Sequence, residues 1–535
     1  MPSSALTNWP VGYEIPGNTS SDISFSWALQ RLQLCDGSHG SCIINSSSPL
    51  PKRVLDLCDS QEQCVKLYES RGEVEWYVCL SHCWGSRVLL RTLSANLESH
   101  RRGIPWDSLP LTYQDAIIFV RRLKIRYLWI DSLCIIQDDE NDWRQEAARM
   151  ASIYQGSYLT ISATKSTDSN GGLFSEAPPK FKSYKLTHLD SNGQTQGIYA
   201  RLHLTHQDPP IMSGAFLGKS PPLPFFKRGW ILQERILSPR VLHFAPEELS
   251  WECLEETACE CSGIITDPVG GISHFCTQPK LLHGFSHWSL LDDKKLERYW
   301  HALIEEYTAL ELAYDRDIFP AISGLAKEFG RVRKCPYFAG LWGKTILKDL
   351  LWYSKAGYTE AWPTRSERWR APTWSWASLK GRINFAPPYD LLDTCEVLEV
   401  VCSPVGPDPT GELAEGFILL RGQLITSVLR YKSQTQATNL AHLYDLELLE
   451  GKMGNVHADY NSMVEGLGHI ELPMTVYCLY IGEANKNSVK SFWFLLLRCI
   501  GESASDECQV FERVGLVEVF YAMEVNGNMT TVKIV

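Results

Sequence analysis

Residues 127–154 read YLWIDSLCIIQDDENDWRQEAARMASIY and combine a strand pattern with a helix pattern. Tyr127–Ile130 is a short apolar run that stops at Asp131, which is typical of a buried strand. Asn141–Tyr154 follows the helical period, with an apolar stripe made of Trp143, Ala147, Met150 and Tyr154. The stretch therefore predicts a strand that leads through a loop into a helix packed on a sheet.

The same alternation continues on both sides of this stretch. Further strands are expected at Trp76–Ser81, Tyr158–Ala163 and Arg240–Phe244. Further helices are expected at Thr112–Lys124, where Thr112 and Asp115 have the spacing of a capping box, and at Arg228–Leu237. Strands that alternate with helices of this length predict an α/β fold, with a parallel sheet flanked by helices.

Composition shifts divide the chain into four parts. Residues 1–50 form a lead-in with one short helix near Ser24–Leu34, and 51–250 form the α/β domain, interrupted by a Ser-, Gly- and Pro-rich insertion at 166–224. Residues 251–385 are expected to be mainly helical, as at Lys294–Ala313 and Ala321–Phe329. Residues 386–535 are expected to be β-rich, with strands near Thr475–Ile481, Phe492–Cys499 and Gly515–Tyr521.

The composition is that of a globular protein. Hydrophobic residues make up 44% of the 535 residues and charged residues 21%, and the net charge is −11. Such an acidic chain is not expected to bind nucleic acid. It has no signal-peptide pattern and no apolar run of the ~18 residues that a membrane span needs. We therefore expect a cytoplasmic protein, whose 17 cysteines are mostly reduced and buried.

Glu146 lies at the edge of the predicted helix stripe, about one turn from both Trp143 and Met150. Two interpretations stay open. A carboxylate in the first turns of a helix stabilises the helix dipole. A carboxylate beside apolar side chains could instead be the chemical centre of the chain.

Two further groups follow predicted strands. Asp131 ends a strand, where open α/β sheets bind ligands, although it could also cap the turn Ser132–Cys134. Ser81-His82-Cys83-Trp84-Gly85 follows the first strand and offers a hydroxyl, an imidazole and a thiol. His82 and Cys83 are adjacent and point apart in an extended chain, so a Cys–His nucleophilic pair is not expected.

The segment Arg228–Arg235 carries a fourth group of polar residues. Arg228 and Arg235 could bind a phosphate in bidentate fashion, or they could pair with Glu234 or Asp131 and serve only the structure. Gln233 lies in the same segment.

We assign no metal site from the sequence. Cys35-x3-His39-x2-Cys42 has the residue types of a zinc site, with Cys58 or Cys64 as a fourth ligand, but no paired CxxC appears. A second cluster contains Cys253, Cys259 and Cys261. The chain has no Walker A loop, GxGxxG or HExxH motif.

Three ordered blocks resemble the signature of the fungal heterokaryon-incompatibility (HET) domain. They are YVCLSHCWG (77–85), YLWIDSLCIIQDDENDW followed by RQEAARMASIY (127–154), and RGWILQERILSPRVLHF (228–244). The lead-in segments CDGSHGSC and LPKRVLDL resemble the usual approach to that domain, and 315–326, 337–343 and 370–378 resemble the tail of long HET proteins. On this resemblance the predicted domain at 51–250 is a HET domain.

The resemblance implies a role in non-self recognition, since many HET proteins of filamentous fungi trigger programmed cell death after incompatible strains fuse. HET domains are also distantly similar to TIR domains, whose enzymatic members hydrolyse NAD at the nicotinamide–ribose bond. In those members a serine-containing loop after a strand lies near a helix with a W-x-x-E element. Here Ser81 and Trp143-Arg-Gln-Glu146 correspond to these two features.

The resemblance therefore implies a TIR-like sheet with Glu146 and Asp131 as catalytic residues. The expected substrate-binding residues are Ser81, His82, Trp84, Trp143, Arg228, Gln233, Glu234 and Arg235. Trp84 or Trp143 would stack on the nicotinamide, and Arg228 or Arg235 would bind the diphosphate. No cofactor is expected, NAD or another small molecule is the expected substrate, and a protein partner or self-assembly is expected. The alternatives are a non-catalytic signalling or oligomerisation module and a HET-fold enzyme of specialised-metabolite biosynthesis.

Overall fold

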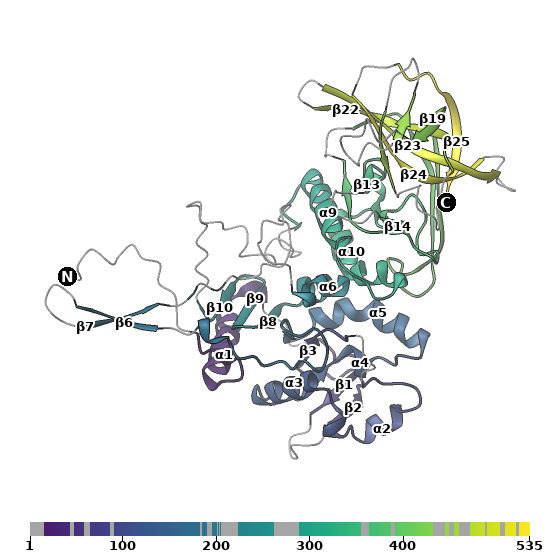
Figure 1. The fold of residues 1–535 in the computed structure, drawn as a ribbon. Helices are drawn as coiled ribbons and strands as arrows, with labels where there is room; N and C mark the ends of the chain where they lie inside the picture. The colour runs from purple at the N-terminus through teal and green to yellow at the C-terminus, as the bar shows by residue number, and fades with distance from the viewer. Residues whose placement is uncertain are drawn as a thin grey trace. The chain divides into compact units, whose positions relative to one another are not determined.

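The computed structural model divides the chain into two compact units, Met1–His287 and Trp288–Val535 (Figure 1). The residues it describes are 15–42, 48–57, 65–85, 90–181, 184–189, 195–200, 202, 204, 223–261, 288–354, 363–386, 391–431, 444–448, 454–459, 471–486, 489–502, 509–520 and 524–535. Each unit is described by itself. The finer division into four parts stays a prediction.

An eight-stranded sheet forms the centre of the first unit. Its order is β10-β9-β8-β5-β3-β4-β1-β2. The strands are β1 (Arg53–Asp56), β2 (Lys66–Glu69), β3 (Tyr77–Ser81), β4 (Tyr127–Trp129), β5 (Leu159–Ser162), β8 (Arg240–Phe244), β9 (Leu249–Cys253) and β10 (Thr257–Cys259). The four central strands β8, β5, β3 and β4 run parallel, and antiparallel strands extend the sheet at both edges.

Among the described residues of this unit, the helices are α1 (Asp22–Ser38), α2 (Leu97–Arg102), α3 (Leu111–Arg122), α4 (Asp131–Cys134), α5 (Glu140–Gln155) and α6 (Gly229–Leu237). Helices α1, α3, α5 and α6 lie where the sequence predicted helices, whereas α2 and the single turn α4 were not predicted. The side chains of β3, β4 and β5 are buried throughout, as expected of parallel strands covered on both faces. The predicted α/β fold, with parallel strands flanked by helices, is confirmed.

Two local predictions are wrong. The predicted capping box of Thr112 and Asp115 does not form, because α3 begins after Pro110, which makes no side-chain cap. The Asp115 carboxylate instead accepts hydrogen bonds from the backbone N–H groups of Leu173 and Phe174. The Asp115 side chain, which the local spacing assigned to the start of the helix, therefore binds a loop that is distant in sequence.

The buried face of α5 is rotated from the predicted stripe. Its buried residues are Asp142, Glu146, Ala147, Met150, Ile153 and Tyr154. Trp143, which was predicted on the buried stripe, is half-buried against the core. Glu146 thus lies inside the buried face rather than at its edge.

The second unit begins with helices and ends with strands, as predicted. Its helices are α9 (Asp293–Tyr307), α10 (Pro320–Arg333) and the short α11 (Ile346–Asp349). Three two-stranded sheets follow, which pair β11 (Tyr337–Phe338) with β12 (Leu341–Trp342), β13 (Trp352–Ser354) with β16 (Ile383–Phe385), and β14 (Thr364–Arg365) with β15 (Leu379–Lys380).

A nine-stranded sheet fills the end of the second unit. Its strands are β17 (Leu391–Asp393), β18 (Glu396–Pro404), β19 (Leu413–Tyr431), β20 (Tyr444–Leu446), β21 (Asn455–Ala458), β22 (Met474–Lys486), β23 (Val489–Glu502), β24 (Gln509–Val519) and β25 (Asn528–Ile534). The long strand β19 pairs with both β22 and β25, so the pairings of β19, β22, β23, β24 and β25 form a closed ring.

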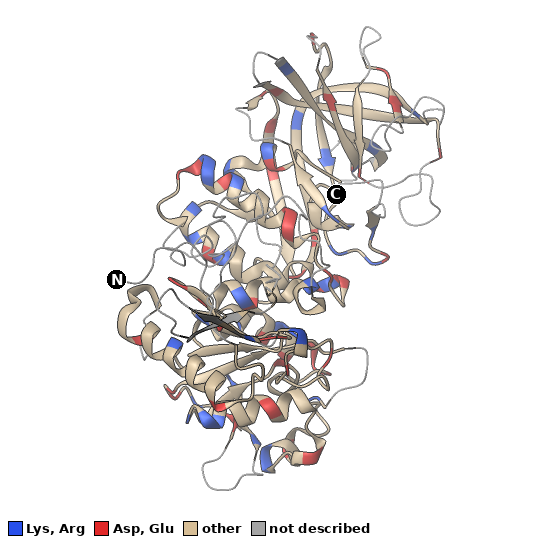
Figure 2. Ribbon diagram, turned by 60° about the vertical axis from the view of Figure 1, so that its left-hand side comes forward, with Lys and Arg blue, Asp and Glu red and all other residues tan. Residues whose placement is uncertain are grey.

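Within the predicted insertion at 166–224, the structure describes a hairpin of β6 (Tyr184–Leu189) and β7 (Thr195–Ala200), and residues 205–222 lie outside the described residues. Lys and Arg residues are interspersed with Asp and Glu residues along the described elements (Figure 2). Among the described helices, none combines the length and the apolar character that crossing a membrane requires.

Candidate functional site

A polar network occupies the carboxyl ends of the parallel strands β3 and β4. Asp131 follows β4 and begins the helical turn α4. Its Oδ2 accepts a hydrogen bond from the Trp84 indole Nε1 at 2.8 Å, and its Oδ1 accepts one from the backbone N–H of Ser132 at 2.7 Å. The side chain is 17% exposed. Burial raises the pKa of Asp131, against the opposing effects of Arg228 and these hydrogen bonds.

Glu234 of α6 lies behind this carboxylate, in the buried part of the network. The Ser81 hydroxyl at the end of β3 donates a hydrogen bond to its carboxylate. Burial raises the pKa of Glu234, while the positive charge of Arg228 and hydrogen bonds from Ser81 and Tyr154 lower it. Two carboxyl groups, Asp131 and Glu234, thus share the charge of one arginine.

His82 holds the network together as a neutral ring. Its Nε2 lies 2.9 Å from the Tyr113 hydroxyl, which in turn lies 2.7 Å from the hydroxyl of Ser132. Burial, helped by the charge of Arg228, lowers the pKa of His82 to about 3. The guanidinium of Arg228 donates to the backbone carbonyl of His82. A histidine that stays neutral at physiological pH suits a positioning role better than proton transfer.

Arg235 has a different partner from those considered in the sequence analysis. Its guanidinium binds both oxygens of Glu252 on β9, with Nε 2.8 Å from Oε2. Both side chains are buried, and Arg235 holds the pKa of Glu252 well below its usual range. The pairing expected with Glu234 or Asp131 is therefore formed with Glu252, and the guanidinium is buried away from solvent. Gln233 is also buried.

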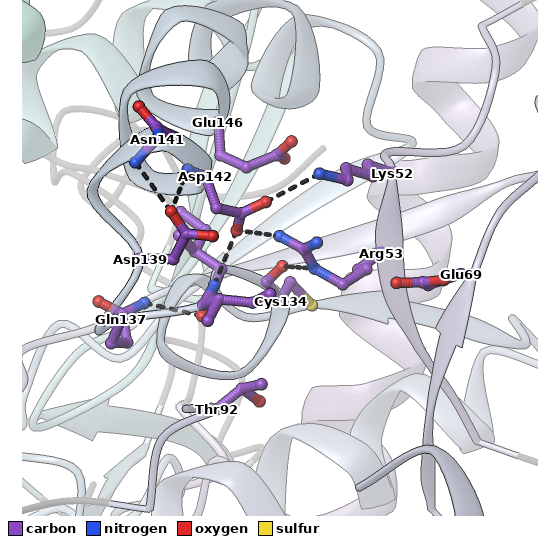
Figure 3. A network of polar contacts seen from close by, with 12 residues as sticks. Lys52, Arg53, Glu69, Thr92, Cys134, Gln137, Asp139, Asn141, Asp142 and Glu146 are labelled. Atoms are coloured by element: carbon purple, nitrogen blue, oxygen red, sulfur yellow. Dashed lines mark hydrogen bonds and ion pairs between the residues drawn. The ribbon is translucent and has the colours of Figure 1, made fainter. Parts of the chain in front are cut away.

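Glu146 lies in a separate cluster under α5 (Figure 3). Its side chain is 1% exposed, and neither carboxylate oxygen has a hydrogen-bond partner. Arg149, one turn along the helix, has its Nη1 3.6 Å from Oε1 of Glu146. Burial raises the pKa of Glu146, and Arg53 opposes this rise more than any other charge does.

Asp142 and Arg53 organise that cluster, and the sequence analysis missed both. The Arg53 guanidinium binds Asp142 Oδ2, and its Nε donates to the carbonyl of Cys134 at 2.7 Å. Lys52 binds the other oxygen of Asp142 at 2.8 Å. The pair Lys52-Arg53 stands before an apolar run in the sequence and was the available sign of a buried cation. No local pattern indicates that its partner is Asp142, which lies 90 residues further along the chain.

The predicted site is thus divided into two clusters and two layers. Trp84, Asp131 and Arg228 are partly exposed at the strand ends, and Ser81, His82 and Glu234 are buried beneath them. Glu146 instead lies with Asp142 and Arg53. Because its side chain is 1% exposed, a ligand could contact it only if the residues packed against it moved. Trp143 is half-buried on the same helix as Glu146.

Comparison with known families decides which domain this is. Residues 77–234 match the family model described as "Heterokaryon incompatibility protein (HET)". The chain carries a HET domain. The match begins at the first residue of β3 and ends at Glu234, so the whole polar network at the strand ends belongs to the HET domain. Arg53, Arg235 and Glu252 lie outside the match.

No curated protein and no solved structure matches the chain. The HET domain makes this a protein of the heterokaryon-incompatibility type. The expected similarity to TIR domains stays an expectation.

Proposed function

We propose that this chain triggers cell death in fungal heterokaryon incompatibility and that its HET domain does so by hydrolysing NAD. The biological half of the proposal rests on the HET domain. The chemical half rests on the strand-end network, and one observation carries it: a partly exposed carboxylate, Asp131, is held at the end of β4 by the indole N–H of Trp84.

The position of this carboxylate suits ligand binding. In open α/β sheets, ligands bind outside the carboxyl ends of the parallel strands. Asp131 and Trp84 follow two neighbouring parallel strands there, and Arg228 adds a positive charge. A substrate with an aromatic ring, a ribose and a diphosphate matches a partly exposed indole, a carboxylate and a guanidinium.

The reaction needs little more than such a carboxylate. The bond between the nicotinamide nitrogen and the ribose C1′ breaks, its electron pair stays on nicotinamide, and positive charge develops on the ribose. A fixed carboxylate stabilises that charge. Water then adds to C1′ and loses a proton, which gives ADP-ribose, nicotinamide and one proton. Asp131 is the group to which we assign this stabilisation.

Glu146 has a different place in the proposal. Its side chain is 1% exposed, so it cannot contact a ribose unless α5 or the residues packed against Glu146 shift. We therefore assign the substrate-facing role to Asp131, and we treat Glu146 as a second carboxylate whose catalytic role would require such a movement.

The test is inducible expression of the full chain in a yeast host, with viability and cellular NAD measured over time. The parent should kill the cells after NAD falls, and Asp131→Asn, expressed to the same level, should do neither. Death at constant NAD would overturn the reaction and favour a signalling module without catalysis. Healthy cells with normal NAD, despite abundant folded protein, would overturn both halves and favour an enzyme of another pathway.

A further inference from the structure

The N-terminal helix of the first unit meets the sheet edge through a set of cysteine and histidine side chains. Cys35 lies in the last turn of α1, His39 caps the end of that helix, and Cys42 ends the short helix η1 (Gly40–Cys42). Cys253 is the last residue of β9, which lies beside α1 (Figure 1). Four potential metal ligands therefore converge from two segments more than 200 residues apart.

The four ligand atoms lie close enough together for one metal ion to bind them all. One ligand atom from each of Cys35, His39, Cys42 and Cys253 lies within 4.8 Å of all the others, and Cys253 Sγ is 3.3 Å from His39 Nδ1. Tetrahedral zinc, with bonds of roughly 2.3 Å to sulfur and 2.0 Å to nitrogen, holds its ligand atoms about 3.3 to 3.8 Å apart. The three cysteines are free thiols, so no disulfide accounts for their convergence.

The surroundings suit thiolate ligands. The Arg240 Nε donates to Cys35 Sγ at 3.2 Å, and the backbone N–H of Glu256 donates to Cys253 Sγ at 3.2 Å. Arg240 is buried, and it also binds the carbonyl of Cys42. Three thiolates and one Zn²⁺ carry a net charge of −1. The guanidinium of Arg240, which also binds the Asp36 carboxylate at 2.6 Å, places a positive charge beside these thiolates. Such outer donors orient ligands and stabilise the charge of a metal–thiolate centre.

We propose that Cys35, His39, Cys42 and Cys253 bind one structural zinc ion, which fastens α1 to the edge of the sheet. Three sulfurs and one imidazole favour zinc over Mg²⁺ or Ca²⁺, which prefer oxygen ligands. Four protein ligands leave no position for a substrate, so the ion is structural rather than catalytic. This inference is independent of the proposed NAD chemistry.

The proposed fourth ligand differs from the candidates considered from the sequence. Cys58 and Cys64 lie outside the described residues, and among the described residues Cys253 gathers with Cys35, His39 and Cys42. The remaining cysteines of the second cluster, Cys259 and Cys261, gather with Glu248 instead. That group supplies three ligands, and we propose no ion there.

The experiment measures zinc in the full-length protein after dialysis, by elemental mass spectrometry. The parent should retain about one zinc per chain, and Cys253→Ala should retain about tenfold less. Cys478→Ala, which removes a buried thiol from β22 in the other unit, is the matched control and should retain the parent value. Loss of zinc from Cys259→Ala but not from Cys253→Ala would overturn the assignment.

A second measurement needs no variant, in case Cys253→Ala does not fold. Cobalt substituted into the parent should give the intense thiolate charge-transfer and visible bands of a tetrahedral cobalt–cysteine centre. A folded parent that binds neither zinc nor cobalt, or that carries a Cys35–Cys42, Cys35–Cys253 or Cys42–Cys253 disulfide by peptide mass spectrometry under reducing purification, would overturn the proposal.

Discussion

The indole Nε1 of Trp84 lies 2.8 Å from Oδ2 of Asp131, and this hydrogen bond joins the segments that follow two neighbouring parallel strands. It fixes the carboxylate at the strand ends while leaving part of it open to solvent. Because the donor is a side chain, it can be removed without changing the acid. The pair therefore offers a direct way to perturb the candidate site.

Trp84→Phe keeps an aromatic ring and removes the N–H. Loss of a hydrogen bond to a charged group costs about 1.5 to 3 kcal/mol, so NAD hydrolysis should fall about 10- to 100-fold. The lost bond stabilised the ionised form, so the pKa of Asp131 should rise further. The acidic limb of the rate profile should then move to higher pH, which nicotinamide release measured across pH would detect. A variant with the parent's rate and pH profile would show that this contact does not serve catalysis.

Glu146→Gln tests the buried carboxylate through stability. Burial raises the pKa of Glu146 above its ordinary value of 4.5. The folded protein therefore binds this proton more tightly than the unfolded chain, so the group favours folding below about pH 4.5 and loses that contribution as pH rises through the folded-state pKa.

At pH 7 the variant should accordingly be more stable than the parent, because the neutral amide avoids the cost of holding a charge in a buried site. Urea unfolding at several pH values measures this difference, which should shrink toward pH 4. A variant that is less stable than the parent at pH 7 would mean that the ionised carboxylate has a favourable partner.

Arg53→Met tests the ion pair that organises the other cluster. Arg53 and Asp142 have side-chain exposures of 1% and 3%, so removing the arginine leaves a buried charge without its main partner. The free energy of unfolding should fall by about 3 to 5 kcal/mol. Lys52→Met is the matched control. Lys52 binds the same carboxylate but is 38% exposed, and its loss should cost less than about 1 kcal/mol. Equal losses in the two variants would contradict the account.

The sequence predicted the parts of the fold that have a local pattern. Continuous apolar runs indicated β3, β4 and β5, and the helical period indicated α3, α5 and α6. The edge strands β1 and β2 were not predicted, because each has only two apolar or aromatic residues between charged ones, Arg53 and Asp56 in β1 and Lys66 and Glu69 in β2. The antiparallel edges depend on pairing between segments that are distant in sequence, which no local pattern contains.

The candidate site was predicted in its residue types but not in its grouping. Ser81 and Asp131 lie at the ends of two neighbouring parallel strands, which end at the same edge of the sheet, and Arg228 interacts with Asp131 there. Glu146 was drawn into another cluster because Asp142 turns inward to bind Arg53, which rotates the buried face of α5. Arg235 forms an ion pair with Glu252. The fourth cysteine or histidine side chain of the cluster at the end of α1 comes from β9. Each of these partners lies on another element, and helical and strand periods carry no information about contacts between elements that are distant in sequence.

The measurement that tests the central claim most directly is nicotinamide release from NAD by the purified full chain, alone and fused to an oligomerising domain. The control for Asp131→Asn is Asp138→Asn, an exposed aspartate of the same segment that accepts a hydrogen bond from the backbone N–H of Ser94. The account predicts release by the parent and by Asp138→Asn, and a rate about 100-fold or more lower for a folded Asp131→Asn. Release that is unchanged in Asp131→Asn, or no release by the parent even when oligomerised, would contradict it.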